Sequence, residues 1–494
     1  MGEVDVRHLQ RPNAENVLFA VLFPNWVNWH SKWYDIPMLI QFSVGNFLSF
    51  DEEQIFSMVA AGGDQHPSHL VPNVPRQGEA VLRIAALYGA NGAGKSNLVQ
   101  AMQFAKSLII EGTRGREAIP VRPFKLGKDA GRPSKFEFTF TAQGVLYNYG
   151  FRLDKVSVQE EWLFATPKSR EVLLFQRALE PDGKNEFEFG AALTGRAKKR
   201  AQFLEFVAEG TRPNQLFLSE ALQRNVTEIQ PVIEWFQKSL LILSAETPAV
   251  HLEMNVHEDE ALTAFLQAVL QATGTGVEQV KTREAVFDME RLPAAMFMAR
   301  EQLEAQLKAA DAVTLNVYGP KEERLTLKRG ADNKIVQVLL QMLHRGKEGQ
   351  LVELSMEEES DGTQRIANLV PALFLLKQNP DQVLVIDELD RRLHPFLSRF
   401  FVQAAIDGDQ LQSNLIFTTH DANLLDLDLL RRDEVWFVEK DNGGASHLYS
   451  LVEFKTRPDL KIEKGYLSGR FGAVPFVKEV HTLRVPQDLV SAPA

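Results

Sequence analysis

The pattern of apolar and polar positions divides the chain into stretches with the periods of strands and of helices. Residues 38–61 alternate between the two classes, as two strands joined by a turn do. Residues 135–154 repeat this pattern, with Phe136, Phe138 and Phe140 on the first arm. Further strand-like pieces follow to about residue 189. We therefore expect an antiparallel β layer within residues 38–189.

The segments around this layer read differently. Residues 1–37 contain three tryptophans and little periodicity, so we expect the compact fold to begin near Met38. The preceding segment is then an N-terminal extension, either an appended arm or a translated leader. Residues 62–78 are rich in proline, glycine, histidine and asparagine, which indicates a surface loop.

The period becomes helical from residue 190 to residue 315. The stretches TEIQPVIEWFQKSL, EDEALTAFLQAVLQAT and AAMFMAREQLEAQLKAAD place apolar residues about 3.6 positions apart. This region also holds the densest basic cluster, which we interpret as a solvated helix face: Arg196, Lys198, Lys199 and Arg200. Strand-like segments return from about Val313 to Leu354, and residues 316–494 read as a second α/β lobe.

A glycine-rich stretch, GANGAGKS, spans Gly89 to Ser96 and fits the pattern G-x-x-x-x-G-K-[ST]. A buried strand is predicted before it at residues 81–88, and a helix after it, which is the context of a phosphate-binding loop. The glycines let backbone N–H groups face the phosphates at a helix N-terminus. Lys95 would reach the β- and γ-phosphates, and the Ser96 hydroxyl would hold Mg²⁺.

Two later strands end in polar residues. In QVLVIDELD, residues 382–390, four apolar residues precede Asp387 and Glu388. Because open α/β sheets bind ligands at the carboxyl ends of their strands, we expect Asp387 in the Mg²⁺ shell and Glu388 beside the attacking water. In NLIFTTHD, residues 414–421, His420 is expected to contact the γ-phosphate.

A second candidate anion cradle is ESDGTQRIANLVPALFLL, residues 359–376. It reads as a polar, glycine-containing turn that opens an amphipathic helix, whose N-terminal N–H groups attract anions. Since the phosphate loop already supplies one such cradle, the second suggests a site completed across a dimer.

Composition limits the remaining classes of function. The formal net charge of -11 argues against a chain covered in basic surface for nucleic acid, although a local groove is compatible with it. The chain has no cysteine, which excludes disulfides, thiolate metal sites and cysteine nucleophiles. No apolar run approaches the roughly 20 residues that span a bilayer. We expect a cytoplasmic protein without membrane contact.

The ordered set GANGAGKSN, ESDGTQR, VLVIDELD, LHP and TTHD resembles the ABC-type ATPase heads of SMC- and RecF-like proteins. It is most similar to bacterial AAA-family ATPases of the RloA type and to the ATPase subunit of PARIS anti-phage systems. The segments IQFSVGNFLSF and YLSGRFGAVPFV strengthen the resemblance, which covers roughly Met38 to Val477.

The resemblance implies an α/β fold, an ABC-type P-loop ATPase head with a mixed sheet flanked by helices, an antiparallel β layer and a helical insertion. The implied domains are an extension (1–37), lobe I (38–189), the insertion (190–315) and lobe II (316–494). The implied cofactors are ATP and Mg²⁺, and the implied assembly is a homodimer or a higher homo-oligomer.

The resemblance also assigns roles to single residues. The Walker A loop would comprise Gly89, Asn91, Gly92, Gly94, Lys95 and Ser96. Asp387 and Glu388 would be the Walker B pair, Asp390 the D-loop residue and His420 the switch histidine. The signature turn, which contacts the nucleotide on the other subunit, would comprise Ser360, Asp361, Gly362 and Thr363. Here Asp361 stands where glycine is typical, and Thr363 where Gln or Glu is.

Three functions follow from this resemblance. The first is an ATP-driven sensor or scaffold in phage defence that controls a separate effector, a Toprim- or RloB-like nuclease. The second is a nuclease with its own Toprim domain, which the short stretch after His420 disfavours. The third is a DNA-repair or chromosome-maintenance ATPase, whose long heptad arms do not fit an insertion interrupted by Pro213, Pro231 and Pro293.

Overall fold

The computed structural model describes most of the chain, namely residues 36–63, 65–72, 80–115, 117–127, 131–245, 252–288, 312–317, 323–330, 334–379, 382–407, 413–455 and 461–474. The chain divides into two compact units, and each is described by itself. The larger unit comprises residues 34–249 and 372–494, and the smaller comprises residues 1–33 and 250–371. The predicted extension, residues 1–37, lies almost wholly outside the described residues.

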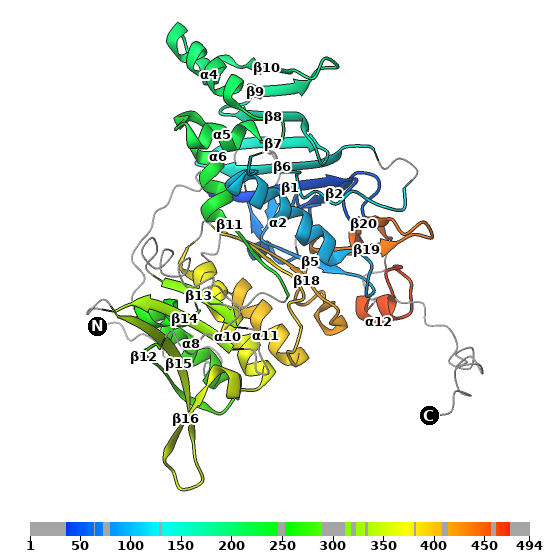
Figure 1. Cartoon of the computed structure of the whole chain (residues 1–494). Coiled ribbons are helices and arrows are strands. Elements are labelled where there is room, and N and C mark those ends of the chain that lie inside the picture. Colours follow the sequence, from blue (N-terminus) through cyan, green and yellow to red (C-terminus); the bar gives the residue numbers. More distant parts are fainter. Residues whose placement is uncertain are drawn as a thin grey trace, which may run out of the picture. The chain divides into compact units, whose positions relative to one another are not determined.

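The first sheet of the larger unit is antiparallel and has seven strands. Both predicted hairpins are confirmed, since β1 pairs with β2 and β6 pairs with β7. The strand order is β10-β9-β8-β7-β6-β1-β2 (Figure 1). The bounds are β1 Met38–Gly45, β2 Gln54–Ser57, β6 Ser134–Ala142, β7 Val145–Leu153, β8 Val158–Thr166, β9 Val172–Leu179 and β10 Asn185–Phe189.

The second sheet of the larger unit has the order β11-β17-β18-β5-β19-β20. The first five strands are parallel, and β20 pairs with β19 in the antiparallel direction. Strands buried on both faces read as continuous apolar runs, as β17 and β5 do. The bounds are β5 Ile84–Tyr88, β11 Leu240–Leu243, β17 Val383–Ile386, β18 Asn414–Thr418, β19 Val435–Lys440 and β20 Ser446–Ser450.

Helix α2, Lys95–Glu111, packs against the antiparallel sheet and lies beside β5 in Figure 1. Its ring Phe104 stands 5.3 Å from Phe47 and 5.1 Å from Phe136, between ring centroids. The apolar residues at helical spacing on α2 join one core with both sheets. This packing fixes the position of the helix whose first residue is Lys95.

Three expectations for this unit need correction. The segment predicted as one strand at 81–88 is two, because β4, Val81–Leu82, pairs with β3, Leu70–Val71, and only β5 enters the parallel sheet. The predicted surface loop at 62–78 includes the buried residue His69. The segment predicted as helical at 190–315 contains β11 in this unit, since a short apolar run such as LLIL does not distinguish strand from helix. It also contains two strands of the smaller unit, β12 (Val277–Val286) and β13 (Ala312–Val317).

Helices do follow β10 in the larger unit, as expected, before β11 begins. They are α3 Ala191–Thr194, α4 Lys198–Gly210, α5 Phe217–Gln223 and α6 Gln230–Glu234, continued by one π-helical turn over Trp235–Ser239. The unit is completed by α11, Pro395–Ile406, and α12, Ile462–Leu467. None of the described helices is both long and apolar enough to cross a membrane.

Within the described residues, the smaller unit contains a sheet on which α7 and α8 pack, and the first part of α10 (Asp361–Gln378). Its strands confirm the return of strand pattern after Val313 and run in the order β12-β15-β14-β13, with β16 paired to β15. The third predicted helical stretch, 294–311, lies outside the described residues. The bounds are α7 Leu252–Glu258, α8 Glu260–Ala272, β12 Val277–Val286, β13 Ala312–Val317, β14 Glu323–Arg329, β15 Ile335–Arg345 and β16 Leu351–Ser355.

A buried carboxylate ties the antiparallel sheet to α5. Glu161 on β8 accepts hydrogen bonds from the backbone N–H groups of Phe217 and Leu218, at 2.7 and 3.0 Å, which lie in the first turn of α5. Tyr149 donates to it at 3.0 Å, and the Arg177 guanidinium lies 3.6 Å away. A buried acid that satisfies this many donors is structural rather than catalytic.

We expect Glu161→Ala to destabilise the larger unit by about 3–5 kcal/mol, because it leaves Arg177 as an uncompensated buried charge. Glu161→Gln keeps one acceptor oxygen and should lower the free energy of unfolding by less. Urea unfolding followed by tryptophan fluorescence measures both changes. An unfolding midpoint of Glu161→Ala equal to that of the wild type would contradict this assignment.

Candidate functional site

Three parallel strands end at the same edge of the second sheet. β18 lies between β5 and β17, with Thr418 opposite Leu87 and Phe417 opposite Ile386. The residues that follow these strands therefore leave the sheet side by side. In this way the structure brings the phosphate loop, the acids after β17 and the polar end of β18 together, although they are far apart in the sequence.

The phosphate loop requires glycine at defined positions. Gly92 and Gly94 have φ values of 76° and 117°, which side-chain-bearing residues rarely adopt. A Cβ atom on Gly94 would also lie 2.3 Å from Oγ of Ser446, and one on Gly89 would lie 2.4 Å from the carbonyl oxygen of Val438. At these positions the loop packs too closely against Ser446 and Val438 to carry a side chain, and its backbone N–H groups form the binding surface.

Lys95 is folded back over this loop. Its Nζ donates to the carbonyl oxygens of Gly89 and Ala90, at 2.7 and 3.3 Å, and lies 3.2 Å from Nδ1 of His420. Burial lowers the pKa of Lys95 to about 8, and the carboxylate of Asp387 opposes this shift. The ammonium group stays mainly protonated at neutral pH and is held at the loop by weak neutral acceptors, from which a phosphate oxygen can displace it.

Ser96 and Asp387 face each other, with 3.1 Å between Oγ and Oδ1. Both supply oxygen, the ligand type that Mg²⁺ prefers. Adjacent ligands of an octahedral ion with bonds of about 2.1 Å stand about 3.0 Å apart, so this pair fits two neighbouring positions of a Mg²⁺ shell. The donor set is therefore compatible with the predicted metal site.

Thr418 connects the two acids to β18. Its hydroxyl donates to Oδ1 of Asp387 at 2.6 Å and accepts from the backbone N–H of Glu388 at 2.7 Å. Glu388 has a φ of 48°, in the left-handed region, which turns the chain sharply after the strand. The Glu388 carboxylate is partly exposed and lies 3.6 Å from the Arg391 guanidinium.

The loop after β18 is held by Asp390, whose carboxylate accepts from the backbone N–H of His420 at 3.2 and 3.3 Å. Burial, and then the charge of Lys95, lower the pKa of His420. A neutral imidazole that accepts from Lys95 at Nδ1 carries its hydrogen on Nε2. His420 can therefore donate Nε2–H to an anion.

These groups surround an open cavity of about 270 Å³. It is lined by the phosphate loop, Glu388 and His420, that is, by Asn91, Gly92, Ala93, Gly94, Lys95, Ser96, Asn97, Glu388 and His420. Cavities that enclose a drug-sized ligand have volumes of roughly 300–1,000 Å³. This one is large enough for the phosphate end of a nucleotide and too open to enclose the whole molecule.

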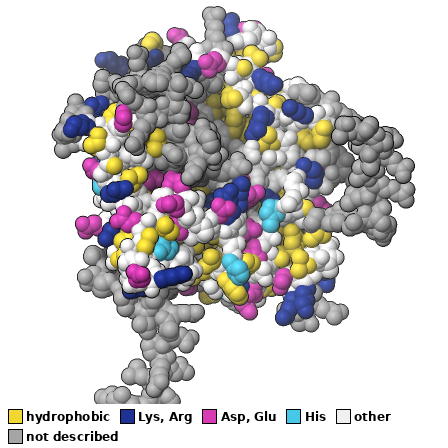
Figure 2. Space-filling model, turned by 60° about the horizontal axis from the view of Figure 1, so that its bottom comes forward, with side chains coloured by type: hydrophobic (Ala, Val, Ile, Leu, Met, Phe, Trp, Pro, Cys, Tyr) yellow, Lys and Arg dark blue, Asp and Glu magenta, His cyan; other side chains and the backbone are white. Residues whose placement is uncertain are grey.

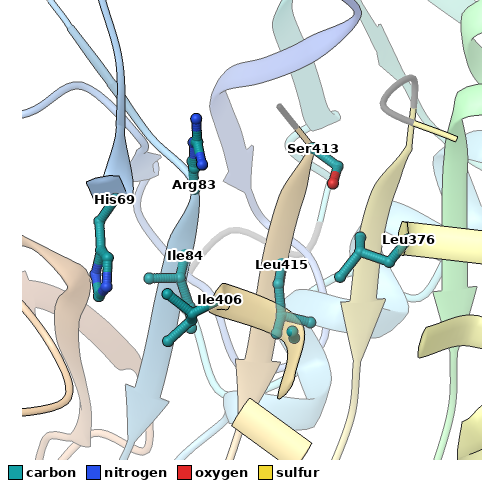
Figure 3. Close-up of a pocket in the computed structure, with 8 residues that line it drawn as sticks. His69, Arg83, Ile84, Leu376, Ile406, Ser413 and Leu415 are labelled. Carbon is teal, nitrogen blue, oxygen red and sulfur yellow. The ribbon is translucent and has the colours of Figure 1, made fainter. Parts of the chain in front are cut away.

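A second cavity lies at the opposite edge of the same sheet (Figure 3). Arg83 and Ser413 directly precede β5 and β18, and the rest of the lining includes Ile84, Leu415 and Ile406. Its volume of about 10 Å³ holds no more than one water molecule. It is a packing defect at the amino ends of the strands and not a ligand site.

The predicted signature turn belongs to the smaller unit and opens α10, Asp361–Gln378. Ser360 caps this helix, since its Oγ accepts from the N–H of Thr363 at 3.2 Å and contacts the Thr363 hydroxyl at 2.9 Å. Ser360 and Asp361 are exposed, Gly362 is half-buried, and Thr363 is buried. The Thr363 hydroxyl is thus engaged within its own helix.

Some residues of the site were not assigned by the sequence analysis. Thr418 was seen only as a polar residue at the end of β18, and its position before His420 was the available signal. Ser446 on β20 contacts the phosphate loop, Ser49 in the turn after β1 contacts Ser446, and neither residue carries a local signal in the sequence. β11 was also missed, although its Leu243 carbonyl accepts from the N–H of Asp387 at 2.8 Å.

The face in Figure 2 shows acidic and basic side chains interspersed rather than gathered by sign. In the predicted basic cluster, Arg196 just before α4 and Lys198 and Lys199 in its first turn are exposed, while Arg200 pairs with Glu228. This agrees with the solvated helix face expected from the sequence.

These features define a phosphate-loop protein of the α/β class. The chain belongs to the family described as "AAA domain, putative AbiEii toxin, Type IV TA system", which matches residues 84–426, more than half of the chain. It therefore carries an AAA-type ATPase domain. No curated protein sequence gives a significant match.

Three of the solved structures that the chain matches are heads of SMC proteins. A SmcHead bound to the C-winged helix domain of ScpA has 13% sequence identity and a TM-score of 0.35, over 84% of this chain and 97% of that one. The SMC head domain from Thermotoga maritima has 12% identity and a TM-score of 0.34, over 84% and 98%. A head from Pyrococcus furiosus, bound to the C-terminal domain of ScpA, has 12% identity and a TM-score of 0.34, over 88% and 99%.

Thr418→Val keeps the side-chain shape but removes the hydroxyl. We expect it to raise the Mg²⁺ concentration needed for half-maximal ATP hydrolysis by about 10–100-fold, the usual cost of losing a group that orients a metal ligand. Thr418→Ser, which keeps the hydroxyl, is the matched control. Titration of the hydrolysis rate with Mg²⁺ measures the effect. Equal Mg²⁺ dependence of the valine and serine variants would exclude this role for Thr418.

Proposed function

We propose that the protein binds and hydrolyses ATP with Mg²⁺ at the edge where β5, β17 and β18 end. The observation that carries this proposal is the convergence of Lys95 with His420, at 3.2 Å, and of Ser96 with Asp387, at 3.1 Å. Each pair joins the phosphate loop to a strand end about three hundred residues away. A glycine turn formed by chance would not be met by a metal-binding acid and a hydrogen-bonding imidazole.

Each side chain has a role in this proposal. The N–H groups of the glycine loop and Lys95 bind the phosphates. Ser96 and Asp387 hold Mg²⁺, which neutralises the phosphate charge when bound. Glu388, partly exposed and beside the cavity, orients and deprotonates the attacking water. His420 donates Nε2–H to the γ-phosphate and stabilises the charge that develops there.

The active assembly is a dimer with two nucleotides at its interface. The open cavity supports this, because the phosphate loop covers only one side of the ligand. Ser360 and Gly362 of each chain would contact the nucleotide on the other, with Asp361 and the capped N-terminus of α10 exposed for that purpose. Thr363, whose hydroxyl caps its own helix, would act by holding the turn rather than by direct contact.

We place this ATPase in anti-phage defence, in the cytoplasm, as a sensor or scaffold that controls a separate effector, a nuclease of the Toprim or RloB-like class. This role rests on the sequence resemblance, since the family description names a toxin of a type IV TA system and no anti-phage sensor. The alternative is a DNA-repair or chromosome-maintenance ATPase. Co-purification with the product of a neighbouring nuclease gene would favour the first, and ATP-dependent DNA binding by the chain alone the second.

We expect Lys95→Ala to abolish ATP binding, because it removes the cation that contacts the phosphates. Glu388→Gln should keep nucleotide affinity, lose hydrolysis by at least about 100-fold, and accumulate as an ATP-bound dimer. Equilibrium binding of a fluorescent ATP analogue, phosphate release and light scattering measure affinity, hydrolysis and dimer formation respectively. Hydrolysis by Glu388→Gln at the wild-type rate would exclude Glu388 as the base.

Mixing two inactive variants tests whether the signature turn acts on the other subunit. Lys95→Ala lacks a phosphate site but has an intact turn, whereas Ser360→Arg has the opposite defect. Random pairing gives heterodimers with one complete site, so we expect recovery of roughly a quarter of the wild-type rate.

The control is a mixture of Lys95→Ala with Glu388→Gln. Both defects lie on the phosphate-loop side, so no complete site can form and no activity should return. If the Lys95→Ala and Ser360→Arg mixture also stays inactive while the two variants do form heterodimers, the shared site is excluded.

A further inference from the structure

The phosphate loop is held from outside by a line of hydrogen bonds. Ser446 Oγ lies 2.5 Å from the carbonyl oxygen of Ala93 and 2.7 Å from Oγ of Ser49. Asn97, in the first turn of α2, donates Nδ2–H to Ser49 Oγ at 2.7 Å. Ser49 and Ser446 are both buried, and the backbone N–H of Ser446 donates to the Ser49 carbonyl at 2.7 Å.

Only one assignment of donors and acceptors is consistent with the three side-chain hydrogen bonds of this line. A hydroxyl has a single hydrogen to donate, and a carbonyl oxygen can only accept. Ser446 must therefore donate to Ala93, Ser49 must donate to Ser446, and Asn97 must donate to Ser49. Hydrogen bonds that run in one direction strengthen one another in a buried environment, so the bond that reaches Ala93 is the end of a cooperative series.

The bond to Ala93 sets the orientation of one peptide group in the loop. In a trans peptide the C=O and the next N–H point to opposite sides, and the described residues contain no cis peptide. With its carbonyl directed to Ser446, the Ala93–Gly94 peptide directs the Gly94 N–H the other way, toward the cavity that Gly94 lines. Gly94 is free to rotate through this orientation because it lacks a Cβ atom.

We infer that Ser446 is a positioning residue for the phosphate-binding loop, and that Ser49 supports it. The inference rests on the proposed ATP-binding function and extends it to two residues outside the loop. Ser49 comes from the connection between β1 and β2, and Ser446 is the first residue of β20. The N–H of Gly94 is thus aimed at the phosphates by β20 of the second sheet and by a turn between two strands of the first sheet, rather than by the loop alone.

The test is the affinity and turnover of the full chain with Mg·ATP. Ser446→Ala removes the donor to Ala93, so the Ala93–Gly94 peptide can rotate, and we expect the Kd for ATP to rise about tenfold. The kcat should stay within about twofold of the wild type, because no residue that contacts the reacting atoms has changed. Tripolyphosphate, which lacks the nucleoside, should lose affinity by the same factor.

Ser49→Ala provides a second variant that acts through the same line. It should raise the Kd about threefold, and the double variant should be no worse than Ser446→Ala alone, since both changes break one series. Ser450→Ala is the matched control. Ser450 is a buried serine on the same strand whose hydroxyl caps a 3₁₀ turn, so its loss should lower stability and leave the Kd unchanged.

The outcomes separate this inference from the proposed function. If the wild-type chain binds neither ATP nor tripolyphosphate, the proposed function fails. If the wild type binds and Ser446→Ala binds equally well, or loses kcat rather than affinity, only the positioning role is overturned. An equal rise in Kd for Ser450→Ala would also overturn it, because the effect would then be a general loosening of β20.

Discussion

The register between β18 and its two neighbours is the constraint on which the site depends. The N–H of Thr419 donates to the Leu87 carbonyl at 3.0 Å, and the N–H of Leu389 donates to the Thr418 carbonyl at 3.0 Å. A slip by one residue would shift a strand end by about 3.3 Å and turn its side chains to the other face. The 3.1 Å separation of Ser96 and Asp387 would then be lost. The apolar runs of β17 and β18 therefore determine the chemistry at their ends.

The charges of the site compensate one another only in part. Lys95 and Asp387 are 4% and 6% exposed, and burial lowers the pKa of Lys95 although Asp387 opposes this. The same burial, together with Lys95, lowers the pKa of His420. A phosphate group would supply the negative charge that favours protonated Lys95, and Mg²⁺ the positive charge that Asp387 and Ser96 are placed to bind. Under the proposed function, binding of a metal-bound phosphate would offset the energetic cost of burying these charges.

What the sequence could predict depends on how local the determinants are. The loop at Gly89–Ser96 and the hairpin of β6 and β7 are set by residues close together in the chain, and both were predicted. β11 was missed because four apolar residues carry no period, and its identity as a strand comes from pairing with β17, over a hundred residues away. The contact of Ser446 with Ala93 spans 353 residues and depends on the order of β5, β19 and β20 in the second sheet, so no spacing rule indicates it. Sequence motifs thus locate the groups that meet the ligand, whereas the groups that orient them are defined only by tertiary structure.

Helix α10 contains residues of both compact units. It begins with the capped turn at Ser360, and the chain passes from the smaller unit to the larger at Pro371. Proline has no N–H, so the carbonyl of Ala367, four residues earlier, loses its helical hydrogen bond there. The backbone ladder of α10 is therefore weakest at the boundary between the two compact units. In the proposed dimer the signature turn contacts a nucleotide on another chain, and the weak point of α10 lies between this turn and the part of the helix that belongs to the larger unit.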